Sequence, residues 1–155
     1  MDKKTIYLET SVVSYLANRP SRDLIVAAHQ TVTREWWERR RLDFTLFVSE
    51  PVLDEAGGGD PDAAAQRLTV VDDIDVLQVT DAAIDLAERL LRSGAIPKEA
   101  AIDALHVALA CVNGIHYSLS SDVELQAHCQ RRTFRGNSSC LYRERLQAPH
   151  YLHAR

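Results

Sequence analysis

The chain has 155 residues, of which 46% are hydrophobic, and it carries a formal net charge of −4 at pH 7. That length is enough for one core of ordinary size and too short for two comfortable domains. No run of about 18 apolar residues could span a membrane, and the first residues lack the long apolar core of a signal peptide. We therefore expect a cytoplasmic protein with no membrane partner.

Short apolar segments with the composition of buried strands alternate with segments of helical periodicity. The predicted strands are residues 5–8, 44–48, 76–79 and 115–119. The predicted helices are residues 12–16, 21–41, 50–56, 61–67, 81–93 and 102–111. This alternation indicates one α/β domain with a mainly parallel sheet and right-handed crossovers.

Polar residues mark the expected starts of several helices. Thr10 and Ser11 are expected to cap the first helix, Ser49 the third, where Pro51 follows in the first turn, and Asp60 the fourth. The second helix has apolar side chains every three to four residues, which predicts an amphipathic helix. This apolar face consists of Leu24, Ile25, Ala28, Val32 and Trp36.

Asp103 is a lone carboxylate in the otherwise apolar helical run 102–111. A buried carboxylate loses several kcal/mol of hydration unless a cation, a metal or good hydrogen bonds replace the water. We therefore expect Asp103 to have a partner and to belong to a functional site. His106, one helical turn further on, can pair with this carboxylate, and we expect it to support Asp103 without being a ligand itself.

Two further acids follow predicted strands. Ligands of open parallel sheets bind beyond the carboxyl ends of the strands, and Glu9 directly follows the first strand. Thr10 and Ser11 come next and provide hydroxyls that can orient Glu9. After the second strand, Glu55 faces a glycine-rich break, whereas Glu50 in a first helical turn also suits the helix dipole. We favour Glu55 for the site, with Glu50 as its competitor.

Carboxylates from separate segments, without a set of His or Cys ligands, suit a hard divalent ion such as Mg²⁺ or Mn²⁺. Such ions activate water and neutralise charge in phosphodiester cleavage. The sequence has no Walker loop, no GxGxxG, GxSxG or HExxH motif, and no cysteine pair with the CxxC spacing of a zinc site. We therefore predict a metal site that includes Glu9 and Asp103.

Three segments, in their order and spacing, resemble the PIN-domain family, and in particular the VapC-type ribonuclease toxins of bacterial toxin–antitoxin pairs. The first segment is residues 6–16, Ile-Tyr-Leu-Glu-Thr-Ser-Val-Val-Ser-Tyr-Leu. The second is residues 49–56, Ser-Glu-Pro-Val-Leu-Asp-Glu-Ala, and the third is residues 102–108, Ile-Asp-Ala-Leu-His-Val-Ala. The resemblance covers about residues 4–122.

This resemblance implies a three-layer α/β/α fold and a metal-dependent endoribonuclease. The family's acidic residues fall on Glu9, Glu55 and Asp103, and a fourth, after the next strand, falls on Asp122. The first acid is usually Asp in the family, whereas this chain has Glu9. A longer side chain can still reach a metal.

The chain departs from the family after residue 122. Relatives with the Glu-Thr-Ser start often continue with a segment like Thr-Trp-Asn-x-x-His and then a final strand and helix. Residues 122–130 can be encoded by codons that, read one base later, give Thr-Trp-Asn-Cys-Arg-His-Ile-Ala. We hypothesise a reading-frame shift near residues 117–122, which leaves a PIN-like domain at 1–122 without its final strand, an atypical tail at 123–155, and Asp122 as an accidental acid. The actual codons of the gene test this.

The leading expectation is a Mg²⁺- or Mn²⁺-dependent endoribonuclease that is the toxin of a type II toxin–antitoxin pair. Its partners are then RNA, an antitoxin protein and, by analogy with the family, a second copy of the chain. Arg39, Arg40 and Arg41 are candidate contacts to the RNA backbone. Their other interpretation is a solvated helix end, where cations complement the helix dipole.

Two alternatives belong to other functional classes. One is a catalytically impaired PIN-like module that binds an antitoxin or dimerises without cleaving RNA, and the altered tail favours it. The other is a small-molecule phosphohydrolase, which the sequence at residues 8–11, Leu-Glu-Thr-Ser, disfavours because it has no DxD pair.

Overall fold

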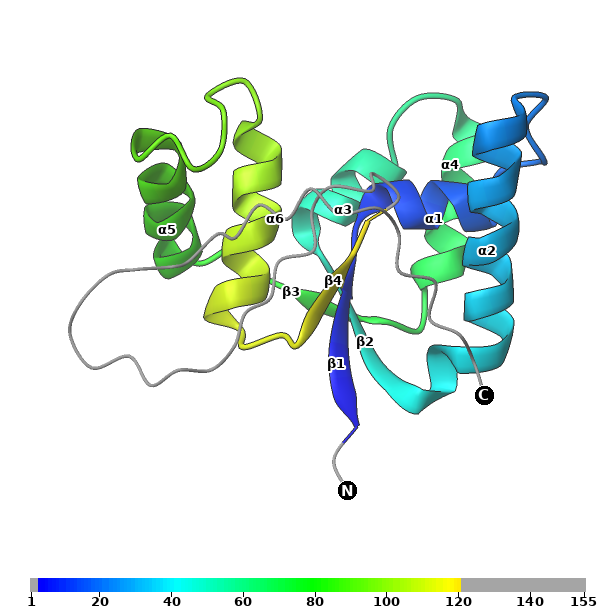
Figure 1. The fold of residues 1–155 in the computed structure, drawn as a ribbon, viewed down its shortest axis with the longest axis horizontal. Helices are drawn as coiled ribbons and strands as arrows, with labels where there is room; N and C mark the ends of the chain where they lie inside the picture. The colour runs from blue at the N-terminus through cyan, green and yellow to red at the C-terminus, as the bar shows by residue number, and fades with distance from the viewer. Residues whose placement is uncertain (1–2, 121–155) are drawn as a thin grey trace.

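Four parallel strands form the centre of the molecule in the computed structural model, which describes residues 3–120 (Figure 1). The strands are β1 (Lys4–Leu8), β2 (Phe44–Ser49), β3 (Asp75–Leu77) and β4 (Tyr117–Leu119). Their order in the sheet is β3-β2-β1-β4, and every neighbouring pair is parallel. The predicted α/β class with a parallel sheet is confirmed. The question of a final strand beyond β4 lies outside the described residues.

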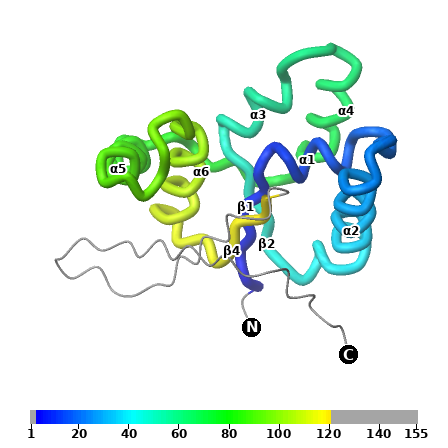
Figure 2. The backbone as a smooth tube through the Cα atoms, turned by 45° about the horizontal axis from the view of Figure 1, so that its top comes forward, coloured from blue at the N-terminus to red at the C-terminus, as the bar shows by residue number. Residues whose placement is uncertain are grey.

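Helices cover both faces of this sheet. They are α1 (Thr10–Ala17), α2 (Leu24–Arg40), α3 (Glu50–Ala56), α4 (Pro61–Val71), α5 (Asp81–Arg92) and α6 (Ala101–Val112), with a short 3-10 helix η1 (Arg41–Asp43). Helices α1, α2 and α4 lie on one side of the sheet, and α5 and α6 lie on the other (Figures 1 and 2). Within residues 3–120, no helix combines the length and apolarity needed to cross a bilayer.

Two groups of buried side chains hold these layers together. The first joins the sheet to α1, α3 and α4 and contains Tyr7, Leu8 and Val48. The second joins α5 to α6 and contains Leu109. Consecutive residues of β1 are buried, as expected for a central strand of a parallel sheet that is covered on both faces. This central position holds the end of β1 in place, directly before Glu9.

The helix starts follow the predicted signals with one exception. Ser49 accepts a hydrogen bond from the backbone N–H of Val52, and Asp60 accepts one from that of Ala63, so both cap their helices as predicted. The N-cap of α1 is Glu9, and no side chain caps this helix, so the prediction that Thr10 or Ser11 does so is wrong. The helix begins at Thr10, two residues earlier than predicted, which leaves the Thr10 hydroxyl available elsewhere.

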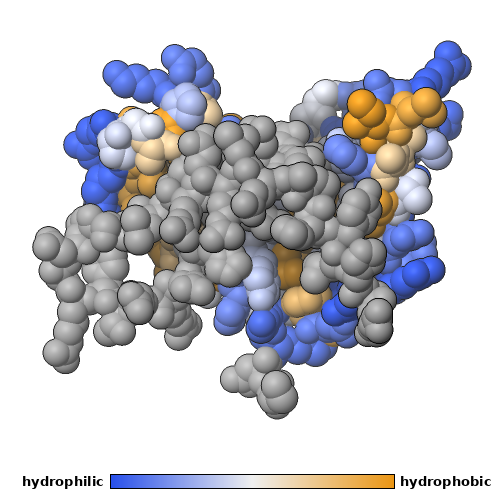
Figure 3. Space-filling model, in the orientation of Figure 1, coloured by the Kyte–Doolittle hydropathy of each residue, from blue (hydrophilic) through white to orange (hydrophobic). Residues whose placement is uncertain are grey.

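Most of the apolar face predicted for α2 does not turn toward the core, although Trp36 packs against it. Leu24 and Ile25 are 86% and 70% exposed, and Figure 3 shows apolar side chains on this part of the surface. Gln30 is the buried residue of the helix. Its side-chain nitrogen donates to the carbonyl of Arg19 over 3.1 Å, and its side-chain oxygen accepts from the backbone N–H of Ser21 over 2.8 Å. The loop before α2 needs these bonds, so a polar side chain occupies the inner position.

Asp23, which the sequence analysis did not single out, caps α2. Its carboxylate accepts hydrogen bonds from the backbone N–H groups of Ile25 and Val26, over 2.9 and 3.0 Å. We expect Asp23→Ala to lower the free energy of unfolding by about 1 kcal/mol, because two helix-terminal donors lose their acceptor. Asp23→Asn keeps an acceptor and should remain near the wild type in urea denaturation. Equal losses in the two variants would contradict the capping role.

Candidate active site

Glu9 lies at the carboxyl edge of the sheet, where β1 ends and α1 begins. Its backbone N–H donates to the carbonyl of Leu119 over 3.1 Å. The hydroxyl of Ser118 donates to its side-chain oxygen Oε1 over 3.0 Å. Glu9 is therefore oriented by β4.

Burial raises the pKa of the Glu9 carboxyl above its ordinary value. Hydrogen bonds from Ser120 and Ser118 and the charge of His106 act in the opposite direction, and the negative charge of Asp103 raises the pKa further. The electrostatic effect of Asp103 means that the two predicted acids share one region of the molecule. A cation bound there would offset both the burial and the repulsion.

Asp103 lies in the first turn of α6. Its side chain is half-buried, whereas Ala104 and residues 106–110 of the same helix are buried. The helix start favours a negative charge, so Asp103 loses less hydration than a fully buried acid. The apolar sequence around Asp103 suggested a deeply buried acid that must have a partner. The observed half-burial makes this requirement weaker.

The structure separates the two candidate acids of α3. The exposed Glu50 accepts a hydrogen bond from the backbone N–H of Val79 over 2.8 Å and so ties α3 to the segment after β3. Glu55 accepts a hydrogen bond from the hydroxyl of Thr10. Its oxygen Oε2 also lies 3.6 Å from Nε2 of His106. Glu55 is thus the acid of α3 that contacts the segments carrying Glu9 and Asp103.

Thr10 and Ser11 do not both have the position expected of them. The expectation that the Thr10 hydroxyl orients Glu9 is wrong, because this hydroxyl donates to Glu55. Ser11 is half-buried in the first turn of α1. The hydroxyls that bind Glu9 come from β4 and the residue after it, which are distant in sequence.

A buried hydrogen-bond network beneath the acids was missed at the level of sequence. The hydroxyl of Tyr7 lies 2.7 Å from Oγ of Ser49 and 2.6 Å from Nδ1 of His106. Burial raises the pKa of Tyr7, so its phenol stays protonated. A tyrosine in the apolar strand β1 and a serine at the end of β2 were the available signals, since a buried hydroxyl requires a partner.

The predicted RNA-binding arginines lie away from the acids. Arg40 forms an ion pair with Asp43 over 2.7 Å. The guanidinium of Arg41 lies 4.9 Å from the centroid of the Trp37 ring. The end of α2 and the short helix η1 contain these residues and lead into the start of β2, so the residues lie near the amino ends of the strands, opposite the edge that carries Glu9.

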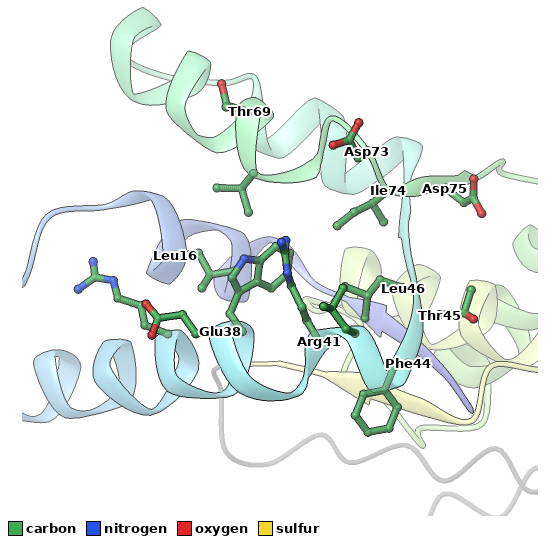
Figure 4. Close-up of a pocket in the computed structure, with 14 residues that line it drawn as sticks. Leu16, Glu38, Arg41, Phe44, Thr45, Leu46, Thr69, Asp73, Ile74 and Asp75 are labelled. Atoms are coloured by element: carbon green, nitrogen blue, oxygen red, sulfur yellow. The ribbon is translucent and has the colours of Figure 1, made fainter. Parts of the chain in front are cut away.

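A groove of about 700 Å³ lies beside these arginines, between α2 and α4 (Figure 4). Arg41 and Phe44 line it from η1 and β2, and Leu16 lines it from α1. Figure 4 shows the Arg41 side chain between the two helices. This groove is separate from the acidic edge and contains none of the predicted acids.

The donor chemistry of the acidic edge suits a hard divalent cation, because Glu9 and Asp103 supply carboxylate oxygens. Among residues 3–120, no group of three or more His, Cys, Asp or Glu side chains is arranged to hold a metal ion. Asp122, the fourth predicted acid, lies outside the described residues. Magnesium is usually held by one or two carboxylates together with waters and substrate phosphates, so two carboxylates fit such an ion.

The parallel sheet covered by helices on both faces matches a PIN-like fold. A solved structure with this fold is VapC20 of Mycobacterium tuberculosis, described as a toxin that cleaves the sarcin–ricin loop. The TM-score is 0.53 with 22% sequence identity, covering 76% of this chain and 90% of that chain. No protein-family model matches the sequence, and no curated protein does. At this identity the likeness shows the fold.

Proposed function

We propose that this protein is a Mg²⁺- or Mn²⁺-dependent endoribonuclease and the toxin of a type II toxin–antitoxin pair. The main support is that two acids from separate elements interact electrostatically. Glu9 lies at the carboxyl edge of the sheet, directly after β1, and Asp103 lies in the first turn of α6. Two carboxylates at this edge attract a cation, and a bound cation attracts a phosphodiester. The likeness of the fold to a toxin described as cleaving the sarcin–ricin loop supports the choice of RNA as substrate.

Glu9 and Asp103 would hold the metal. When bound, the ion supplies charge neutralisation and activation of water for attack on the phosphodiester. Ser118 orients the Glu9 carboxylate over 3.0 Å, so this ligand is held in position before the ion binds.

Glu55 has a different role in this proposal. Its side chain is 37% exposed and is contacted by Thr10 and His106. A carboxylate that is held by neighbouring side chains and open to solvent is suited to accept a proton from the attacking water. We assign proton transfer to Glu55 and metal binding to Glu9 and Asp103.

The partners follow from the same proposal. RNA is the substrate, an antitoxin protein controls the activity, and a second copy of the chain completes a dimer. The alternative is a catalytically impaired module that binds the antitoxin without cleaving RNA. It is favoured by the sequence of residues 123–155, which departs from the family pattern and follows the region where the fourth acid is expected.

Metal-dependent cleavage of a mixed RNA pool by the purified full chain distinguishes the two. After treatment with EDTA the wild type should be inactive, and added Mg²⁺ or Mn²⁺ should restore cleavage. Asp103→Asn should reduce the metal-restored rate by about a hundredfold, since a metal contact contributes several kcal/mol. Asp85→Asn, which removes an exposed carboxylate of α5, should retain the wild-type rate.

The absence of cleavage by a folded wild-type chain at every metal concentration would overturn the nuclease proposal. Circular dichroism of each sample establishes that the fold is intact. Binding of an antitoxin by such an inactive chain would then support the alternative function.

A further inference from the structure

The hydroxyl of Tyr7 connects the core to the acidic edge. It lies 2.7 Å from Oγ of Ser49 and 2.6 Å from Nδ1 of His106. Tyr7 and Ser49 are 0% exposed, and His106 is 4% exposed. The other ring nitrogen of His106, Nε2, lies 3.6 Å from a carboxylate oxygen of the much more exposed Glu55. A buried chain of polar groups therefore ends on an acid that solvent can reach.

The number of available protons determines the direction of each hydrogen bond among Ser49, Tyr7 and His106. Ser49 Oγ already accepts a hydrogen bond from the backbone N–H of Val52, and its other partner is the Tyr7 hydroxyl, where either oxygen can be the donor. If Ser49 donates to Tyr7, the single phenol proton of Tyr7 goes to Nδ1 of His106. Nδ1 then carries no proton, and the imidazole proton lies on Nε2, facing Glu55.

The opposite arrangement is unfavourable at both ends. If Tyr7 donated to Ser49 and Nδ1 of His106 donated to Tyr7, Ser49 would accept two hydrogen bonds and donate none. In the neutral ring, Nε2 would then present a lone pair to the Glu55 carboxylate over 3.6 Å. Like charge densities at this distance repel each other in a partly buried site. Between the two neutral forms of the ring, the geometry therefore favours the first arrangement.

We propose that Tyr7 and His106 are positioning residues for Glu55. Tyr7 holds His106 as the tautomer with the proton on Nε2, and this N–H, together with the Thr10 hydroxyl, orients the Glu55 carboxylate. The 3.6 Å separation is too long for a hydrogen bond, so the N–H acts on Glu55 electrostatically in the free protein. Such contacts often shorten when substrate binds. The meaning of this orientation for catalysis rests on the proposed ribonuclease function.

The tautomer of His106 can be measured without any activity. Long-range ¹H–¹⁵N correlation spectra of the full chain, at mildly alkaline pH and without metal, distinguish a bare ring nitrogen from a protonated one. His106→Gln identifies the signals of this ring among the six histidines of the chain. We expect a bare Nδ1 and a protonated Nε2. A proton on Nδ1, in the other tautomer or in a doubly protonated ring, would overturn the inference.

Tyr7→Phe removes the donor to Nδ1 and keeps the aromatic ring. We expect the two ring nitrogens of His106 to move toward averaged shifts, as the ring samples both tautomers. Tyr15→Phe is the matched control, because it also removes a tyrosine hydroxyl. Tyr15 lies in α1, and its ring packs near His29 and not near His106. Unchanged His106 signals in a folded Tyr7→Phe variant would overturn the role of Tyr7. If that variant does not fold, the wild-type spectrum still tests the tautomer.

The kinetic consequence is a lower turnover with little change in substrate affinity. Tyr7→Phe should reduce kcat for RNA cleavage about tenfold, in the range typical of residues that orient a functional group, with KM near the wild-type value. Tyr15→Phe should change neither parameter. If the wild type cleaves no RNA but shows the expected tautomer, the proposed function fails and the positioning of Glu55 stands. If the tautomer differs from expectation, the positioning inference fails whatever the activity.

Discussion

Glu9→Gln is expected to abolish RNA cleavage and to make the metal-free protein more stable at neutral pH. The loss of activity follows from the removal of one of two charged metal ligands. We expect cleavage to fall by about a hundredfold or more, since contacts to a catalytic ion contribute several kcal/mol to the transition state. Glutamine keeps the length and one oxygen of the side chain, so the hydrogen bond from Ser118 can remain.

The gain in stability follows from the direction of the pKa shift. Burial raises the pKa of the Glu9 carboxyl in the folded chain above its ordinary value of 4.5. Below pH 4.5 the carboxyl is protonated in both states, and burial has little effect on stability. As the pH rises from 4.5 through the raised folded value, the unfolded chain releases its proton first, and the folded chain loses stability. The glutamine variant has no charge to bury and does not suffer this loss.

Thermal unfolding as a function of pH, in EDTA to exclude stabilisation by metal, measures this effect. The melting temperature of Glu9→Gln should exceed that of the wild type at neutral pH, and the difference should shrink as the pH falls toward 4.5. Glu35→Gln, at an exposed position of α2, should follow the wild type throughout. A difference for Glu9→Gln that does not change with pH would contradict the burial of this charge.

Leu109→Ala should cause the largest loss of stability among the variants considered. Leu109 is fully buried between α6 and α5. Truncation of a buried leucine costs about 2–5 kcal/mol, through lost apolar burial and the cavity that remains. Domains of this size have total stabilities of about 5–15 kcal/mol. The variant should therefore lose a large part of its stability and unfold at a much lower urea concentration.

Val112→Ala is the control for this variant, because Val112 is 41% exposed at the end of the same helix. The free energy of unfolding of Val112→Ala should fall by less than about 1 kcal/mol, as is usual for exposed positions. Urea denaturation of both variants, with the slope of the transition compared, measures the two effects. Similar losses at the two positions would show that the α5–α6 interface is not packed as described.

The features that were predictable from sequence are mostly local. The capping roles of Ser49 and Asp60 depend on residues three positions away. The strands were visible as apolar runs because the sheet is covered on both faces. The amphipathic pattern of α2 was also local, but it did not show which face turns inward. That face is determined by the bonds of Gln30 to the preceding loop.

The relations within the candidate site are non-local, and most could not be read from the sequence. Tyr7 meets Ser49 and His106 across 42 and 99 residues of chain. Glu9 is bound by Ser118, at a separation of 109 residues, whereas the adjacent hydroxyl of Thr10 binds Glu55. The acids themselves were recognisable, because carboxylates at strand ends and in apolar helices are unusual. Which hydroxyl binds Glu9 depends on the register of β1 against β4.

Because the backbone of Glu9 is hydrogen-bonded to β4, the position of this acid depends on whether the edge strand is in place. Strand β4 has three residues and pairs with β1 alone among the described strands. The amide of Glu9 donates to the carbonyl of Leu119, so its hydrogen-exchange rate reports directly on whether β4 is docked. A local opening of β4 would free the Glu9 side chain while the interface between α5 and α6 remained intact. Exchange at this one amide therefore measures how often the acidic edge is assembled.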